Sequence, residues 1–348
     1  QEDNVADVVE AENLSQLRHL LAERADANAL SRSTGSSALA AAACNNRSDA
    51  VTLLLAARAE VNLRVATDSG RTALHQAALH GCAEACLCLF AHRADPEALD
   101  EEGYTALHLA SLEGRCDVLR GLIDGKANLQ AKVIEQVPSW GCEALHLAVL
   151  AGRHEAARCL LDAKASVNFV TSGPLSQISP LLIAALHGRA NFIQLLVEAK
   201  ADPEAHFTDV NPELEEDDVP ETPLLGAAYE NDVDSCRALL ESRSCTETVD
   251  TKHRTALMIA TDCRSSDVIR FLVAQQADLE ARDGDGHIAF VRACESRNEV
   301  AAALLRELGA DDQAKNSAGI TACDLVRVAK GRPIELPDSC RFFSACPA

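Results

Sequence analysis

A short motif recurs in phase along most of this chain and limits the folds that it can adopt. Residues 103–114 read GYTALHLASLEG, and related copies begin at Arg71, Cys142, Ile178, Glu221 and Arg254. Thr105 suits a helix N-cap, because its hydroxyl can accept a hydrogen bond from a free N–H in the first turn. Gly114 suits the position after a helix, because glycine adopts positive φ without steric cost. The motif therefore predicts a series of short helices that begin and end at equivalent positions.

The equivalent N-cap positions divide the chain into ten repeats. They are Asp3, Ser37, Thr72, Thr105, Glu143, Ser179, Thr222, Thr255, Ile288 and Thr321, the last four of them 33 residues apart. A fixed period of this length is typical of arrays in which each repeat packs only against its neighbours. We therefore expect one array over residues 1–348, with an N-terminal capping repeat at 1–36, internal repeats at 37–320, and a C-terminal capping helix and tail at 321–348.

The motif resembles the ankyrin repeat, whose units carry Thr-Pro-Leu-His-x-Ala at this place and have a period of about 33 residues. The resemblance implies an all-α fold, a solenoid of stacked helix-turn-helix units with β-hairpin-like finger loops. It also implies that His75, His108 and His146 are structural residues that hydrogen-bond backbone groups near the hairpin loops. Three later repeats lose that bond, because other residues take the histidine position, namely Leu182, Leu225 and Met258.

The resemblance also implies a class of function. We expect a monomeric, non-catalytic scaffold that binds a protein or peptide partner through its concave face and finger loops. The alternative is that the chain is the regulatory ankyrin region of a larger multidomain enzyme, channel or ubiquitin-ligase adaptor. Gln1 is the first residue and Met258 the only methionine, so we interpret the chain as a fragment, a processed product or a region of a longer protein.

The charge of the chain bears on its partner. The formal net charge is −21, from 32 Lys and Arg against 53 Asp and Glu. Such an acidic chain is poorly suited to bind nucleic acid or an anionic membrane surface, because both carry dense negative charge. The charge favours a basic protein or peptide partner. The alternative is that the acidity serves only to keep the chain soluble.

Cysteine usage and hydropathy suggest where the protein works. The fourteen cysteines do not form paired CxxC clusters with the spacing of a zinc site. We interpret them as reduced thiols, of which Cys86 and Cys236 act as small buried hydrophobic residues, and expect a cytoplasmic or otherwise intracellular protein, with the nucleus included. No run of 18 apolar residues occurs, so we expect no direct membrane insertion.

The sequence contains no convincing catalytic or metal-binding signature, and we expect no catalytic residue, metal site or cofactor. His154 and Glu155 begin like a zinc-protease HExxH motif, but Arg158 takes the place of the second histidine. Asp283 and Asp285 lie in a stretch that resembles a calcium loop but lacks the third acidic ligand and the distal glutamate. We interpret that stretch as a hairpin turn.

A row of apolar residues is the best candidate for a partner-binding surface. Seven residues after successive N-caps lie Leu79, Leu112, Leu150, Leu186 and Tyr229, followed by Asp262 and Glu295. Stacking would align the apolar residues into a stripe that turns acidic at its end. The stripe is either an exposed binding surface or a set of leucines half-buried against the adjacent repeat.

Two aromatic residues on loops are further candidates for partner contact. Tyr104 lies at a finger position just before the Thr105 cap. Trp140 is the only tryptophan and lies in a lengthened finger, where it either packs onto the repeats or contacts a partner.

The longest insertion is strongly acidic. Residues 201–221 hold nine carboxylates and no Lys or Arg, including Asp209, Glu213, Glu215, Glu216, Asp217 and Asp218. Charge repulsion and two internal prolines predict a mobile, solvated loop. The alternatives are a docking site for a basic peptide or a weak chelator of divalent cations.

Two asparagines resemble sites of a covalent modification. Asn28 and Asn62 each lie eight residues after a leucine, Leu20 and Leu54, and follow Asp/Glu-Ala/Val. This context is similar to the one used by the asparaginyl hydroxylase that modifies ankyrin hairpins. Asn is also an ordinary turn residue at such positions, so the pattern predicts possible hydroxylation only.

One repeat departs from the pattern in a way that predicts weakness. Gly226 lies inside the first helix of the seventh repeat, where glycine costs up to about 1 kcal/mol relative to alanine. We expect this repeat to be the weakest joint of the array.

Overall fold

The computed structural model describes residues 4–65, 69–134, 141–171, 178–206, 221–317, 319 and 321, and within them it is entirely helical. It contains eighteen helices and no strand in this described part. Isolated antiparallel bridges, such as Leu30 with Ser37 and Val249 with Thr255, give some of the loops a hairpin-like start. The expected all-α class with hairpin-like loops is therefore confirmed.

The chain divides into two compact units, Gln1–Pro174 and Leu175–Ala348, each of which is described by itself below. The helices of compact unit 1 are α1 (Val5–Glu10), α2 (Leu14–Ala22), α3 (Ala38–Cys44), α4 (Ser48–Ala56), α5 (Ala73–His80), α6 (Ala83–Ala91), α7 (Ala106–Glu113), α8 (Cys116–Asp124), α9 (Ala144–Leu150) and α10 (His154–Asp162). The helices of compact unit 2 are α11 (Pro180–Leu186), α12 (Ala190–Glu198), α13 (Pro223–Tyr229), α14 (Val233–Glu241), α15 (Ala256–Asp262), α16 (Ser266–Ala274), α17 (Ala289–Glu295) and α18 (Glu299–Glu307). The expectation of one array with capping ends stays a prediction.

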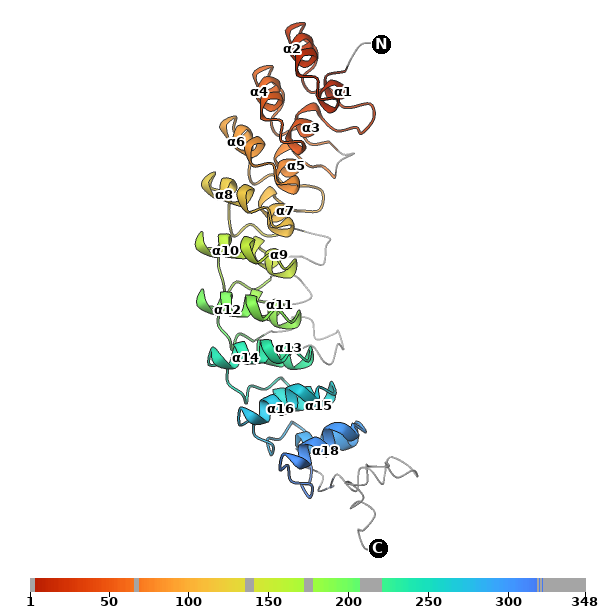
Figure 1. Cartoon of the computed structure of the whole chain (residues 1–348), viewed down its shortest axis with the longest axis vertical. Helices are drawn as coiled ribbons and strands as arrows, with labels where there is room; N and C mark the ends of the chain where they lie inside the picture. The colour runs from red at the N-terminus through yellow and green to blue at the C-terminus, as the bar shows by residue number, and fades with distance from the viewer. Residues whose placement is uncertain are drawn as a thin grey trace. The chain divides into compact units, whose positions relative to one another are not determined.

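Each compact unit is a stack of helix pairs. Within each unit, the first helix of a repeat packs on the first helix of the next, and the second helices pack on one another in the same way (Figure 1). The first helices approach closely because they bury small residues, such as Ala77, Ala78 and Ala110, each with 0% exposure. Buried leucines such as Leu107 and Leu122 fill the space between the two layers, and each contributes about 1.5–3 kcal/mol of burial free energy.

The predicted N-caps locate the starts of the helices. Eight of the ten, from Ser37 to Ile288, directly precede a first helix. The hydroxyls of five of them accept a hydrogen bond from the third helical N–H, namely Ser37, Thr105, Ser179, Thr222 and Thr255. At the N-terminal end, Asp3 lies outside the described residues, and Asn4 is the N-cap of α1. At the C-terminal end, the tenth repeat lies outside the described residues beyond Thr321.

The three motif histidines join adjacent repeats, as the resemblance implied. In His108, Nδ1 accepts a hydrogen bond from the backbone N–H of Thr105 at 3.1 Å, and Nε2 donates to the carbonyl of Ala131 at 2.9 Å. The Nε2 atoms of His75 and His146 donate in the same way to the carbonyls of Tyr104 and Phe169, each at 3.0 Å. Burial lowers the pKa of His108 to about 4, so the ring stays neutral and keeps this donor–acceptor arrangement.

A second set of bonds ties the loop after a second helix to the next loop in six repeats. The side-chain oxygens of Asn28 and Asn62 accept hydrogen bonds from the backbone N–H groups of Glu60 and Asp95, at 2.7 and 2.9 Å. Glutamates do the same in other repeats, namely Glu97, Glu204, Glu247 and Glu280. The position therefore needs a side-chain acceptor, which both residue types supply.

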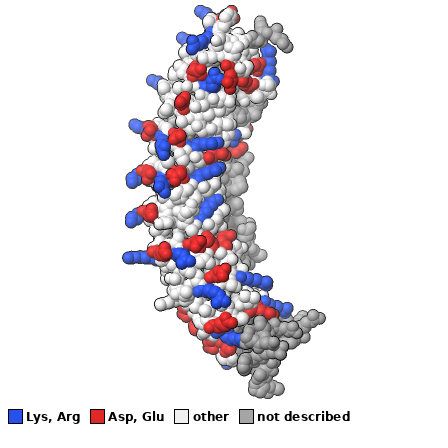
Figure 2. Space-filling model, in the orientation of Figure 1, with Lys and Arg blue, Asp and Glu red and all other residues white. Residues whose placement is uncertain are grey.

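Charged residues of both signs are interspersed over the face drawn in Figure 2. On the second helices many form exposed pairs, such as Arg120 with Asp117 at 3.2 Å and Arg237 with Asp234 at 4.0 Å. Such exposed pairs contribute about 0–1 kcal/mol each. The net negative charge is therefore not gathered into one acidic patch on this face.

Gly226 is explained by its neighbour. A Cβ atom at Gly226 would lie 3.2 Å from Cδ2 of Leu186 and 3.5 Å from Cδ1 of Leu182. The glycine lets α13 approach the large residues of α11, so its low helix propensity is exchanged for close packing. The predicted weakness of this repeat is not tested by this geometry and stays a prediction.

We expect Gly226→Ala to stabilise the protein more in a Leu186→Ala background than in the wild type. In that background the tight contact is gone, and the gain in helix propensity is expected to approach about 0.5–1 kcal/mol. Urea unfolding of the wild type, both single variants and the double variant measures the coupling. Equal gains in both backgrounds would show that Leu186 does not require the glycine.

Glu143 is an unusual cap residue, because a carboxylate takes the place of a hydroxyl. Its residue exposure is 1%, and neither carboxylate oxygen has a hydrogen-bond partner among the residues that the structure describes. Burial raises the pKa of Glu143 to about 7, and the positive charge of Lys132 opposes the rise. An acid with a raised pKa destabilises the fold as pH increases, because the unfolded chain loses the proton first.

We therefore expect Glu143→Gln to stabilise the protein at pH 8 but much less at pH 4.5. The difference should develop between pH 4.5 and 7 and amount to roughly 1–3 kcal/mol. Urea unfolding at a series of pH values measures it, and Glu84→Gln on the exposed side of α6 is the control. A difference between wild type and variant that does not change with pH would contradict the assignment.

Candidate functional site

The apolar row of compact unit 1 lies at the C-terminal ends of the first helices. Leu79 and Leu112 are half-buried near the ends of α5 and α7, while Leu150 ends α9 and is 37% exposed. Leu112 packs against a buried cluster that includes Leu109, Val133 and Leu147, with Tyr104 and Cys142. Leu112 thus supports the neighbouring repeat and Leu150 reaches the surface, while partner binding at the row stays a prediction.

The row of compact unit 2 has one half-buried and one exposed member. Leu186 is half-buried beside Gly226, whereas Tyr229 ends α13 and is 44% exposed. Leu150 and Tyr229 are therefore the row residues that offer the most apolar surface.

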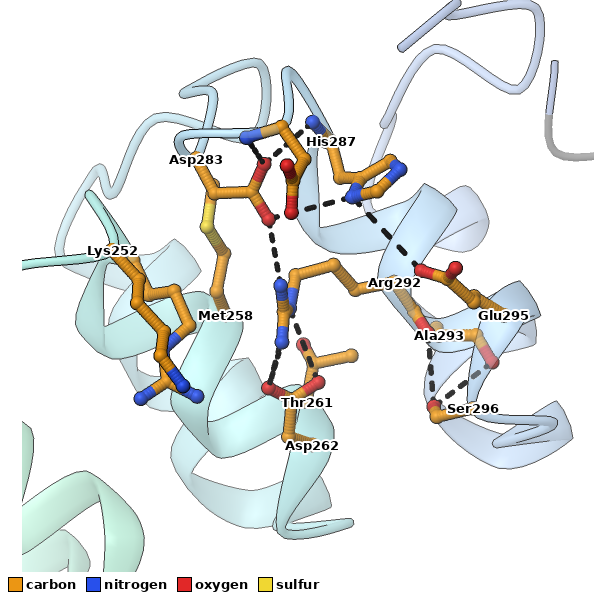
Figure 3. A network of polar contacts seen from close by, with 12 residues as sticks. Lys252, Met258, Thr261, Asp262, Asp283, His287, Arg292, Ala293, Glu295 and Ser296 are labelled. Carbon is orange, nitrogen blue, oxygen red and sulfur yellow. Dashed lines mark hydrogen bonds and ion pairs between the residues drawn. The ribbon is translucent and has the colours of Figure 1, made fainter. Parts of the chain in front are cut away.

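The acidic end of the row faces other residues of the chain. Arg292 binds Asp262 through two nitrogens, with Nη2 2.6 Å from Oδ2, and its Nη1 lies 2.6 Å from Oδ2 of Asp283 (Figure 3). Burial lowers the pKa of Arg292, but the bonds to the two aspartates outweigh this effect and hold it above its usual value. Glu295 lies 3.9 Å from Nδ1 of His287. Asp262 is thus already paired within the protein, whereas Glu295 stays largely exposed beside His287.

A pocket of about 760 Å³ lies against this network. It is lined by Lys252, Arg254, Asp262, Asp283, Gly284, Asp285, Arg292 and Ser296. Three cationic and three anionic side chains balance in its wall, and Arg254 is held at 2.6 Å by Asp250. Among the described residues no group of three or more metal-ligating side chains occurs.

Asp283 forms a hairpin turn, as the sequence analysis predicted. Its Oδ1 accepts hydrogen bonds from the N–H groups of Asp285 and His287, at 3.0 and 2.8 Å. Asp100 makes the same pair of bonds to Glu102 and Tyr104. These aspartates organise the fingers and are engaged with backbone groups.

The loop residues predicted to contact a partner have different outcomes. Tyr104 is 7% exposed and lies edge-on to His108, with ring centroids 6.2 Å apart, so it packs inside the fold rather than projecting from the finger. Trp140 lies outside the described residues, as do the acidic residues Asp209, Glu213, Glu215, Glu216, Asp217 and Asp218. Hydroxylation of Asn28 and Asn62 stays a prediction, and both side chains bridge adjacent loops here.

The cysteines in the described part are free thiols, and several are deeply buried. Burial raises the pKa of Cys86, Cys142 and Cys236 to about 12. These thiols act as small hydrophobic residues, because a thiolate is disfavoured there. None of the described helices is long and apolar enough to cross a bilayer.

Two arginines that the sequence analysis missed lie at the apolar row of compact unit 1. Nε of Arg115 donates to the carbonyl of Leu79 at 3.2 Å, and Nε of Arg153 donates to the carbonyl of Leu112 at 2.8 Å. Both arginines are exposed and are the N-caps of α8 and α10. The available signal was their shared position directly after a glycine that follows a first helix.

The stems of these arginines are held by the preceding repeat. A Cβ atom at Gly81 or Gly114 would lie 2.9 Å from Cδ of Arg115 or Arg153, respectively. Both glycines have positive φ, at 80° and 70°, and so end α5 and α7 while leaving room for the stem.

Comparison with known proteins agrees with this repeat geometry. A family model that describes three consecutive ankyrin repeats matches residues 6–100, 67–133, 126–207, 206–283 and 224–316. No curated protein matches the chain. The crystal structure of the human ASB11 ankyrin repeat domain is similar, with a TM-score of 0.55 and 23% identity, over 68% of this chain and 96% of that one.

That level of identity concerns the fold alone, whereas the family model covers most of the sequence. The periodic N-caps, the bridging histidines and the stacked helix pairs agree with both comparisons. This chain belongs to the ankyrin-repeat family.

Proposed function

We propose that the chain is a non-catalytic scaffold that binds a protein or peptide partner through the ends of its first helices. Ankyrin repeats are generally protein–protein interaction modules, and their fold is typically non-catalytic. The observation that carries the proposal is the exposure of Leu150 and Tyr229, at 37% and 44%, at equivalent ends of two first helices.

Helix packing makes this position suitable for recognition. Leu79, Leu112 and Leu186 are each half-buried, so their orientation is fixed by the neighbouring repeat before a partner arrives. A preformed apolar surface loses less side-chain entropy on binding than a flexible one. The remaining exposed area is small for each residue, so affinity should depend on several such contacts together.

We expect a Leu150→Glu/Tyr229→Glu variant to lose partners that the wild type captures from a cell lysate. Burying a new carboxylate against an apolar partner costs several kcal/mol, so capture should fall at least about tenfold. Quantitative mass spectrometry of the bound proteins gives the readout, and circular dichroism checks that the variant is folded.

The matched control is Leu87→Glu/Val300→Glu. These two residues are even more exposed, at 57% and 67%, but lie on the second helices α6 and α18. Loss of the same partners from the control and the test variant would point to general disturbance. Retention of all partners by the Leu150/Tyr229 variant would refute the proposed surface.

A further inference from the structure

The inter-repeat bond made by Arg115 and Arg153 does not itself require a charged side chain. At the same position of other repeats, Sγ of Cys82 donates to the carbonyl of Cys44 at 3.2 Å, and Nδ2 of Asn298 donates to the carbonyl of Thr261 at 2.7 Å. Cys82 and Asn298 are buried, at 6% and 4% exposure. A small neutral residue therefore serves the structural role, and the arginines bring additional exposed donors.

Those additional donors are held in place and accessible. In Arg115 the Nε–H is used by the carbonyl of Leu79, and no ion pair or further hydrogen bond to a described residue engages its terminal nitrogens. In Arg153 the only further contact of this kind is a distance of 4.0 Å from Nη2 to Oε2 of Glu113. A guanidinium fixed through Nε keeps its two terminal NH₂ groups as a fork for an anion.

The forks lie beside the proposed apolar surface. Arg115 and Arg153 are bonded to the main chain of Leu79 and Leu112 themselves, which are two members of the row. A peptide that contacts the row in compact unit 1 would therefore pass within reach of both guanidinium groups. Carboxylates match this planar fork better than any other protein side chain does.

We infer that Arg115 and Arg153 recognise acidic side chains of a peptide segment whose apolar residues contact Leu112 and Leu150. The inference rests on the proposed function and assigns a chemistry to the partner at that surface. It reverses, for compact unit 1, the expectation of a basic partner drawn from the net charge.

The net charge of −21 does not prevent this recognition. Salt screens exposed charges beyond about 8 Å at physiological ionic strength, so nearby groups decide the local preference. The carboxylates beside the two arginines are Glu113, which lies 4.0 Å from Arg153, Asp117, which pairs with Arg120 at 3.2 Å, and Glu155, which lies 3.5 Å from His154. Of these three carboxylates, only Glu113 forms an ion pair with either arginine among the described residues, so the terminal nitrogens of Arg115 and most of those of Arg153 stay available to a partner.

The test is a selection of random short peptides displayed on phage against the full chain. We expect the enriched peptides to combine apolar residues with Asp or Glu and to bind more weakly as salt increases. An Arg115→Asn/Arg153→Asn variant keeps a donor of the kind that Asn298 provides but lacks the charge. We expect its affinity for these peptides to be lower than that of the wild type by a factor of about ten or more.

Two further variants separate the possible results. Arg120→Asn removes an exposed arginine that pairs with Asp117 on α8 and should leave binding unchanged. Leu150→Glu should abolish binding. Peptides lost by Leu150→Glu but retained by the double arginine variant would overturn this inference and leave the proposed function in place. If the peptides bind the Leu150→Glu variant and the double arginine variant as tightly as the wild type, this inference and the proposed function are both overturned. Enrichment of Lys or Arg in place of acidic residues would overturn this inference alone.

Discussion

Each repeat of this chain depends on its neighbour, because its first helix is too short to satisfy its own backbone. A helix leaves about four N–H and four C=O groups unbonded at its ends, and α9 has only seven residues. Cap hydroxyls accept hydrogen bonds from some of the free N–H groups at the N-terminal ends of these helices. Donors from the next repeat serve carbonyls near the C-terminal end, as Arg115 does for Leu79 and Asn298 does for Thr261. The stack is therefore held by directional bonds as well as by apolar burial.

The sequence predicted the features that recur from one repeat to the next. The caps and the turn formed by Asp283 follow from local patterns, whereas the all-α class and the histidine bridges between repeats were implied by the resemblance to ankyrin repeats. Features that depend on a residue about one repeat away could not be read in this way. Leu186 is half-buried because Gly226 leaves space for it, and Asp262 is paired because Arg292 lies on the first helix of the next repeat, where most repeats have an apolar residue.

The case of Tyr104 shows how a family position can mislead. Finger residues just before a cap are often used for contacts, and this expectation placed Tyr104 at the surface. Here its carbonyl accepts the bond from His75, and its ring lies against His108. A large aromatic ring at that point gains more by completing the cluster with Leu147 than by facing water. Burial in a repeat protein is thus decided by the adjoining repeat.

The same reasoning separates the charge of a protein from the charge that a partner meets. The net charge sums all carboxylates, but Asp262, Asp283 and Asp250 are neutralised by Arg292 and Arg254 within the fold. Asp100 and the loop glutamates such as Glu97 are turned toward backbone N–H groups. Many acidic side chains are therefore used to build the hairpins and loops. The two arginines at the apolar row are each bonded to the main chain through Nε, which leaves terminal nitrogens for the binding segment inferred above.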